Sequence, residues 1–264
     1  MTDLAGVVLA AGLGTRLRPL TELLPKALCP VANVPLVDLA LGRLRPLVGG
    51  LAVNVHHHRA RMVAHLAAEH PRVHVSNEEG EALGTAGALG RLRPWIDGRA
   101  VLVHNADAWF DDPTAGERLL DGWDGVRLRL LAVPARAGLA PDFDGRHTFA
   151  GVSLLPWSAI TPLELTPSGL WEVSWRQAWD EGRIELVPLD PDAPWFDTGT
   201  PATYLAANLA ATGGRSAVHP SATVDPTARV ERSVVWPEAR VAAGERLCEQ
   251  IRAAGGITVD APQP

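Results

Sequence analysis

The chain has 264 residues, of which 47% are hydrophobic, and its formal net charge is −6 at pH 7. This length suits one full-sized α/β domain with a small appendage, and the charge provides no basic field that would attract nucleic acid. Two cysteines are too few for a disulfide framework, and no apolar run reaches the roughly 18–20 residues of a membrane helix. The start of the chain lacks the features of a signal peptide. We therefore expect a cytoplasmic protein without nucleic-acid or membrane partners.

Short apolar runs alternate with helix-like stretches along most of the chain. The pattern predicts strands at 7–11, 51–55, 73–76, 100–103, 126–133 and 151–155, and helices at about 58–69 and 85–92. Strands separated by helices indicate βαβ units, so we expect an α/β fold with a Rossmann-like, doubly wound, mostly parallel sheet. Ligands bind at the carboxyl ends of the strands in such sheets.

The composition changes at Gly213-Gly214, where a six-residue period begins. This period resembles that of hexapeptide-repeat tails and predicts a short left-handed β-helix. We therefore expect a main domain over 1–212 and a tail over 213–264. The open end of such a helix has unpaired strand edges, so the tail also predicts a homo-oligomer. The side chains expected to face inward are those of Val218, Val224, Val230 and Val241.

The first apolar run leads directly into the turn Gly12-Leu13-Gly14-Thr15-Arg16. Two glycines let the backbone fold tightly and approach a ligand closely. Its N–H groups, together with Arg16 and Lys26, predict a cradle for polyphosphate. The spacing excludes a P-loop, which needs Gly-x-x-x-x-Gly-Lys-Ser/Thr, and the dinucleotide fingerprint, which needs a third glycine where Leu17 stands.

Residues 8–38, VLAAGLGTRLRPLTELLPKALCPVANVPLVD, resemble the signature of the sugar-1-phosphate nucleotidyltransferases, LAAG-x-GTR-x-x-P-x-T followed by PK. The resemblance continues at 79–88, similar to E-x-x-LGTAGAL, and at 195–201, which matches W-x-D-x-G-T-P. The apolar strand at 101–107, which ends in Asp107, resembles a fourth family segment. Together these segments imply the nucleotide-diphospho-sugar transferase type of fold.

The resemblance implies transfer of a nucleoside monophosphate from an NTP to a sugar 1-phosphate, with release of pyrophosphate. Arg16 would hold the β- and γ-phosphates, because a planar fork matches phosphate oxygens, and Lys26 would place a point charge at the α-phosphate or the acceptor phosphate. Asp107 and Asp197 would bind Mg²⁺. The residues implied in nucleotide binding are Ala10, Ala11, Gly12, Gly14, Thr15, Glu81, Gly84, Thr85 and Gly87.

Between 134 and 150 the resemblance weakens, because the segment is short and lacks the E-K-P triplet that many relatives use to hold the sugar phosphate. The pattern Thr148-Phe149-Ala150-Gly151 is similar to the branch that activates muramic-acid and heptose or mannose phosphates. Thr148 and Gly151 are therefore the candidates for the acceptor site.

Three functional hypotheses remain open at this point. The opening motif, the LGTAGAL-like segment and the tail most resemble mannose-1-phosphate guanylyltransferases. The short acceptor segment instead favours an enzyme similar to N-acetylmuramate-1-phosphate uridylyltransferases. The third hypothesis is a regulatory paralogue that binds a nucleotide or nucleotide sugar without turnover.

Overall fold

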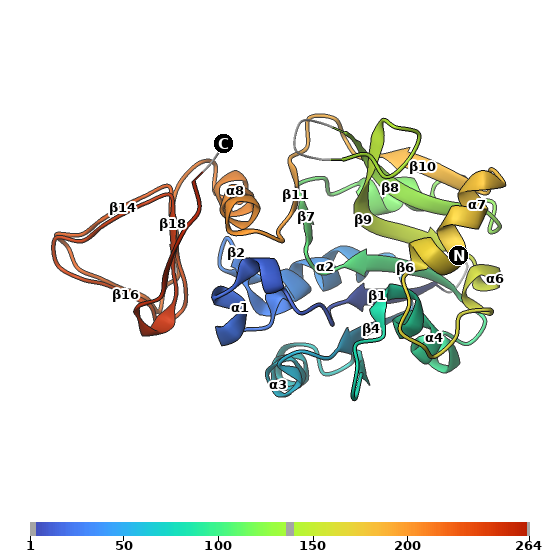
Figure 1. Cartoon of the computed structure of the whole chain (residues 1–264), viewed down its shortest axis with the longest axis horizontal. Helices are drawn as coiled ribbons and strands as arrows, with labels where there is room; N and C mark the ends of the chain where they lie inside the picture. The colour runs from blue at the N-terminus through green and yellow to red at the C-terminus, as the bar shows by residue number, and fades with distance from the viewer. Residues whose placement is uncertain (1–3, 136–139, 263–264) are drawn as a thin grey trace.

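The computed structural model describes residues 4–135 and 140–262, and it centres on a seven-stranded sheet (Figure 1). Across the sheet the strands follow the order β10-β8-β9-β6-β1-β4-β5, and only the pairings of β9 are antiparallel. The predicted α/β, Rossmann-like, mostly parallel fold is confirmed. The strands are β1 (Leu4–Leu9), β4 (Gly50–Val55), β5 (His74–Asn77), β6 (Ala100–Asn105), β8 (Leu128–Pro134), β9 (His147–Leu155) and β10 (Ile184–Pro188).

Alternate side chains of each strand point to opposite sides of the sheet, so both faces carry apolar residues. Helices cover both faces. On β1, Leu4 and Val8 share one core with α2 (Leu36–Leu44), α3 (Arg59–Glu69) and α5 (Ala115–Leu120). Ala5 and Val7 share the other core with α4 (Gly84–Ile96), α6 (Trp157–Ile160), η3 (Trp171–Trp175) and α7 (Arg176–Asp180). None of the helices in the described ranges has the length and hydropathy of a membrane span.

The remaining elements before the tail lie around the end of the sheet where β1 ends, and all of them except α8 are short. They are η1 (Thr15–Leu17), α1 (Leu20–Leu23), η2 (Lys26–Leu28), the hairpin of β2 (Pro30–Val31) and β3 (Val34–Pro35), the ladder of β7 (Ala108–Phe110) and β11 (Trp195–Asp197), and α8 (Pro201–Ala211). A Thr200–Thr203 capping box begins α8, with Pro201 in its first turn.

The tail winds into triangular coils of short strands, with α8 between these coils and the sheet (Figure 1). Strands of successive coils pair in parallel along each side of the triangle. The left-handed β-helix and the 213–264 boundary stay predictions, because the ladders alone give no handedness. The strands are β12 (Ala217–Val218), β13 (Thr223–Val224), β14 (Arg229–Glu231), β15 (Val234–Val235), β16 (Arg240–Val241), β17 (Arg246–Cys248) and β18 (Gln250–Arg252), followed by η4 (Ala254–Gly256) and β19 (Thr258–Asp260).

The two ends of the coil are finished differently. At the last coil, Arg252 is buried and pairs in register with Val235. It donates to the Arg240 carbonyl at 2.8 Å and forms an ion pair with Glu245, so a paired charge covers this end. At the first coil, Val218 remains 37% exposed. Val218 still stacks in register on the buried Val235, and its exposure reflects the open end of the coil, on which no described strand stacks. Val241 is buried as predicted, and Val224 and Val230 are partly buried against the same interior cluster.

Tyr204 of α8 joins the tail to the main domain. Its hydroxyl donates to the Pro30 carbonyl of β2 and accepts from Trp236 Nε1 at 2.9 Å, and the side chain is fully buried. Burial raises the pKa of Tyr204 well above its ordinary value, so the hydroxyl stays a neutral donor. Ala217, Val234 and Ile251 of the coil lie in the same apolar core as this tyrosine. The coil therefore covers apolar surface of the main domain.

We predict that Tyr204→Phe lowers the free energy of unfolding by about 1–3 kcal/mol, because Trp236 Nε1 and the Pro30 carbonyl lose their buried partner. Urea denaturation of this variant, of Trp236→Phe and of the double variant would measure the coupling between the two side chains. A loss below about 0.5 kcal/mol, within the range of ordinary surface substitutions, would contradict a hydrogen-bonded junction.

Candidate active site

The glycine turn lies at the carboxyl end of β1, as predicted. Gly14 has a φ of +62°, and a Cβ there would lie 2.8 Å from Thr21 Cγ2, so the position requires glycine. The Thr21 hydroxyl donates to the Gly14 carbonyl at 2.8 Å and fixes the turn. The backbone N–H groups of 11–14 find no acceptor within the described part of the chain. They are therefore available to an anion.

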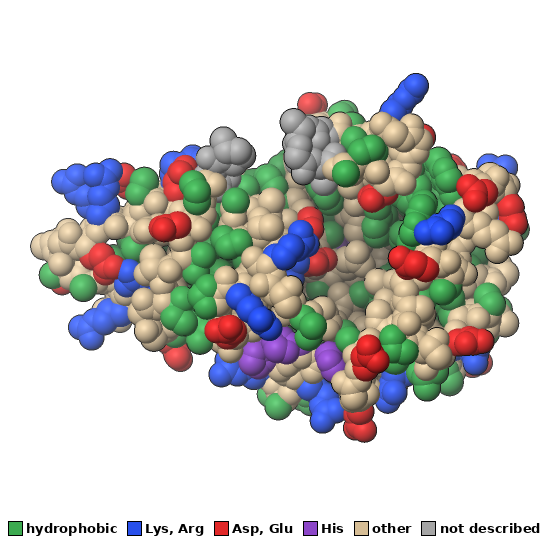
Figure 2. Space-filling view, in the orientation of Figure 1, with side chains coloured by type: hydrophobic (Ala, Val, Ile, Leu, Met, Phe, Trp, Pro, Cys, Tyr) green, Lys and Arg blue, Asp and Glu red, His purple; other side chains and the backbone are tan. Residues whose placement is uncertain are grey.

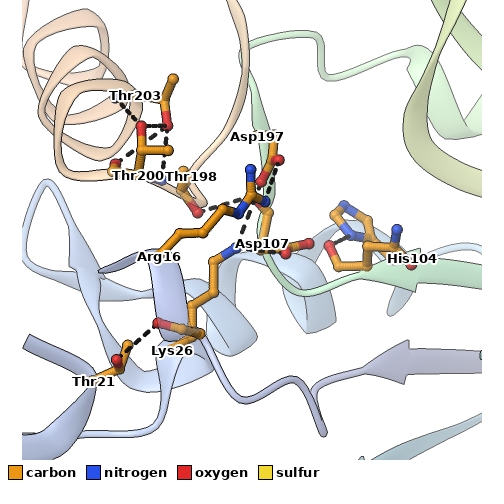
Figure 3. Close-up of polar contacts among 11 residues, drawn as sticks. Arg16, Thr21, Lys26, His104, Asp107, Asp197, Thr198, Thr200 and Thr203 are labelled. Atoms are coloured by element: carbon orange, nitrogen blue, oxygen red, sulfur yellow. Dashed lines mark hydrogen bonds and ion pairs between the residues drawn. The ribbon is translucent and has the colours of Figure 1, made fainter. Parts of the chain in front are cut away.

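Lys26 contacts both of the predicted metal carboxylates (Figure 3). It begins η2, and its Nζ lies 2.6 Å from Asp107 Oδ2 and 3.5 Å from Asp197 Oδ1. The Lys26 side chain is only 10% exposed. A charge with so little access to water needs anionic partners, and the two carboxylates provide them.

Asp197 reaches this position through the small antiparallel ladder of β7 and β11. Asp197 pairs with Ala108, directly after Asp107, although 90 residues separate the two carboxylates in sequence. Thr198 then donates to the Asp107 carbonyl through its N–H at 3.0 Å and its hydroxyl at 2.9 Å. On the open side, Arg16 Nη2 lies 3.2 Å from Asp197 Oδ2 (Figure 3). The structure thus brings both predicted cations and both predicted carboxylates together.

Two cavities meet at Asp107, and Figure 2 shows the hollow in the middle of this face, with acidic and basic side chains at its rim. The first, which we call the turn cavity, has a volume of about 250 Å³ and includes Gly12 and Gly84 in its wall. The second, which we call the Thr148 cavity, has a volume of about 300 Å³ and includes Asp197. Asn105 and Asp107 line both. Molecules in the two cavities would therefore meet beside the same carboxylate.

The structure places the predicted nucleotide-binding residues unevenly around the turn cavity. Ala11, Gly12, Gly84 and Thr85 line it, whereas Ala10, Gly14, Thr15, Glu81 and Gly87 are not part of its wall. The Thr85 hydroxyl accepts from the Leu170 N–H at 2.8 Å. A Cβ on Gly87 would lie 2.3 Å from the Thr166 carbonyl oxygen. Thr85 and Gly87 thus also serve the packing of α4 against the segment at 163–170.

Sequence reasoning missed a buried polar network behind the turn cavity. Asn54 Oδ1 accepts from the Ala10 N–H at 2.8 Å, and Asn54 Nδ2 donates to Glu78 Oε1 at 2.7 Å. Glu78 Oε2 in turn accepts from the Leu83 N–H at 2.9 Å. The network connects the glycine turn to the loop before α4, so it fixes both walls of the cavity. The available signal was a polar Asn54 within an otherwise apolar strand.

The acceptor candidates Thr148 and Gly151 both line the Thr148 cavity. Thr148 is buried, and its hydroxyl donates to the Ala140 carbonyl at 2.9 Å. Asp142, which the sequence analysis did not single out, also lines the cavity and accepts from the Phe149 N–H at 2.8 Å. Residues 136–139 of the short acceptor segment lie outside the described residues.

His104 lies on β6 behind the site and is held neutral. Its Nδ1–H donates to the Asn105 carbonyl at 2.8 Å, while its buried Nε2 has no hydrogen-bond partner among the described residues. Burial, together with the nearby Arg43 guanidinium, lowers the pKa of His104 to about 3. Folding therefore excludes a proton that the unfolded chain would bind below pH 6.5.

We predict that the exclusion of a proton from His104 makes the free energy of unfolding rise with pH between about 5 and 7. Since the native pKa of His104 is lower than its unfolded value, acidification favours the unfolded state, by about 2 kcal/mol at pH 5. In His104→Phe this contribution should disappear. Urea denaturation of both proteins at pH 5 and pH 7 measures it, and an identical pH dependence in the variant would contradict a neutral, buried imidazole.

Comparison with known proteins agrees with this geometry. The nucleotidyl transferase family model matches residues 5–121. An N-acetylmuramate alpha-1-phosphate uridylyltransferase of Caulobacter vibrioides is 31% identical over 229 residues, which cover 76% of this chain and 94% of that protein. A mannose-1-phosphate guanyltransferase of Yarrowia lipolytica is 26% identical, over 85% of this chain and 72% of that protein.

A solved structure, the inositol-1-phosphate CTP transferase of T. maritima, superposes with a TM-score of 0.66. It covers 80% of this chain and 96% of the other at 17% identity, a level that shows a shared fold. Two observations establish the family. The first is the similarity to the curated relatives, and the second is the convergence in one site of Arg16, Lys26, Asp107 and Asp197. The chain belongs to the sugar-1-phosphate nucleotidyltransferases.

Proposed function

We propose that the protein transfers a nucleoside monophosphate from an NTP to a sugar 1-phosphate and releases pyrophosphate. The observation that carries this proposal is the pair of cavities that meet at Asp107, with Lys26 in contact with both carboxylates. The turn cavity would take the nucleotide and the Thr148 cavity the sugar. The reaction joins these two substrates at the α-phosphate, which would lie where the cavities meet.

Asp107 and Asp197 suit a divalent cation, which we propose to be Mg²⁺. Asp197 Oδ1 is buried and makes no hydrogen bond to a described residue, since Lys26 Nζ lies 3.5 Å away as an ion-pair partner, so it can accept a cation without losing a hydrogen bond. Mg²⁺ prefers one or two carboxylates completed by phosphate oxygens and water. When bound, the ion would neutralise phosphate charge and make the α-phosphorus more electrophilic.

The basic side chains would exchange carboxylates for phosphates when substrate enters. The ion pair of Arg16 with Asp197 joins side chains that are 64% and 44% exposed, and such pairs contribute only about 0–1 kcal/mol. Arg16 can therefore exchange Asp197 for the β- and γ-phosphates with little loss of free energy. Lys26 is enclosed, so it would stay in place and take a phosphate oxygen as its new partner.

The acceptor needs little chemical activation, because a sugar 1-phosphate is already an anion at neutral pH. The site must instead align its oxygen with the α-phosphorus and stabilise the departing pyrophosphate, so positioning and electrostatics dominate. The free N–H groups of 11–14 and the Arg16 guanidinium would stabilise the charge that develops on pyrophosphate.

Two substrate pairs are the leading candidates. GTP with mannose 1-phosphate is supported by the opening motif, the LGTAGAL-like segment, the tail and the Yarrowia relative. UTP with N-acetylmuramate 1-phosphate is supported by the short acceptor segment and the Caulobacter relative. A cytoplasmic location and a homo-oligomer stay predictions from the sequence.

A screen of four NTPs against a panel of sugar 1-phosphates, with pyrophosphate release as the readout, tests the proposal. We expect release with one donor and one acceptor class, and only with a divalent cation present. Nucleotide binding by calorimetry without release from any pair would instead favour the regulatory paralogue.

We predict that Asp107→Ala and Asp197→Ala each lower kcat by about 10²–10⁴-fold, because the cation that positions the α-phosphate loses a ligand. Pyrophosphate release measures the loss, and circular dichroism checks the fold. The matched control is Asp121→Ala, which removes an exposed carboxylate away from both cavities. Near-normal turnover in either site variant would contradict the cation site.

We also predict that Arg16→Lys lowers kcat/KM by the equivalent of about 2–4 kcal/mol, since a two-pronged donor becomes a point charge. Arg18→Lys, directly after η1 and likewise exposed, is the control and should stay near wild type. If both variants behave alike, Arg16 does not hold the leaving pyrophosphate.

A further inference from the structure

A second cluster of ligand-type side chains lies away from both cavities. It consists of Asp38 on α2, His65 on α3 and His70 directly after α3. The two helices lie against the same face of the sheet and share one apolar core. His70 also lines a cavity with Gly49 and Gly50, where β4 begins. Because β4 runs parallel to β1, this is the opposite end of the sheet from the glycine turn.

The three side chains already converge on one point. Asp38 Oδ1 lies 2.7 Å from His65 Nε2 and 2.8 Å from His70 Nε2. One ligand atom from each residue lies within 4.8 Å of the other two. In tetrahedral zinc sites, neighbouring ligand atoms are roughly 3.3 Å apart. Small rotations of the three side chains would therefore suffice to admit an ion between them.

Their exposure suits an ion with one open position. The Asp38 and His65 side chains are each 20% exposed and that of His70 is 13% exposed, so the ligands are held by packing yet remain accessible to water. Two imidazole nitrogens and one carboxylate oxygen, completed by water, match zinc and related ions. Mg²⁺ prefers oxygen ligands, so this donor set differs in kind from Asp107 and Asp197.

We propose that Asp38, His65 and His70 form a binding site for a first-row transition-metal ion of the Zn²⁺ class. The bound ion links α2 to the end of α3. This ion takes no part in the transfer reaction, because its site lies at the opposite end of the sheet. It joins two helices that are separate in sequence, so its binding energy adds to the stability of the folded state.

A contact between Arg45 and His70 would have to break before this site could bind an ion. Arg45 Nη2 lies 3.0 Å from His70 Nδ1, an arrangement in which Nδ1 accepts and Nε2 carries the proton. An ion on Nε2 requires the other tautomer, with the proton on Nδ1, so the Arg45 contact must break. Arg45 is exposed and can turn into solvent. Arg45→Ala should therefore bind the ion at least as tightly as the wild type.

Co²⁺ is the sharpest probe, because its visible spectrum reports coordination geometry. Chelator-treated full-length protein would be titrated with Co²⁺ in the presence of excess Mg²⁺, which competes with Co²⁺ for the oxygen ligands of Asp107 and Asp197. We expect one Co²⁺ per chain with an intense visible band of four-coordinate type. Its affinity should fall by more than about 100-fold in His65→Gln and in Asp38→Asn. Zn²⁺ should raise the Tm of the wild type and not of these variants.

The control variant is His57→Ala, which removes one member of the consecutive histidines at 56–58 and should leave both readouts unchanged. Circular dichroism of each variant establishes that it is folded. The proposal is overturned if the wild type gives neither a visible band nor a Tm shift with Zn²⁺. It is also overturned if His65→Gln and wild type bind Co²⁺ equally. The three side chains would then act only as a hydrogen-bonded link between the helices.

Discussion

An enclosed ammonium group determines how this candidate active site is assembled. Lys26 is almost shut off from water, and a charge in that position must have anionic partners. Asp107 and Asp197 supply them from two different segments, and the pairing of β7 with β11 holds both. In the proposed reaction the same requirement would also govern substrate binding, because a cation would enter the carboxylate pair only if Lys26 gained a phosphate in exchange. Metal and phosphate are therefore expected to bind together.

The parts of the site that sequence predicted well are those fixed by nearby residues. The Gly12–Arg16 turn follows a buried strand, and its geometry depends on Gly14 and Thr21, which lie close in the chain. Asp107 and Asp197 stand in short motifs at the ends of strands. The sheet order was not predictable in detail, since β9 inserts antiparallel between β6 and β8.

Contacts between distant segments account for what sequence reasoning missed. Thr85 and Gly87 face the segment at 163–170, and nothing in their own motif indicates that packing. The link from Asn54 through Glu78 likewise depends on two neighbouring strands and the loop before α4. In the tail, the six-residue period predicts repeated strands correctly, but it does not distinguish the exposed first coil, with Val218, from the buried second one.

The central claim is that Lys26 exchanges a carboxylate for phosphate as a cation binds between Asp107 and Asp197. A crystal structure with Mg²⁺ and an NTP analogue that has a non-hydrolysable α,β-bridge tests it most directly. We expect an ion bound by both carboxylates, the triphosphate along the Gly12–Arg16 turn, and Lys26 Nζ bonded to a phosphate oxygen. A bound analogue that leaves the 2.6 Å pair of Lys26 with Asp107 intact, with no ion between the carboxylates, would contradict it.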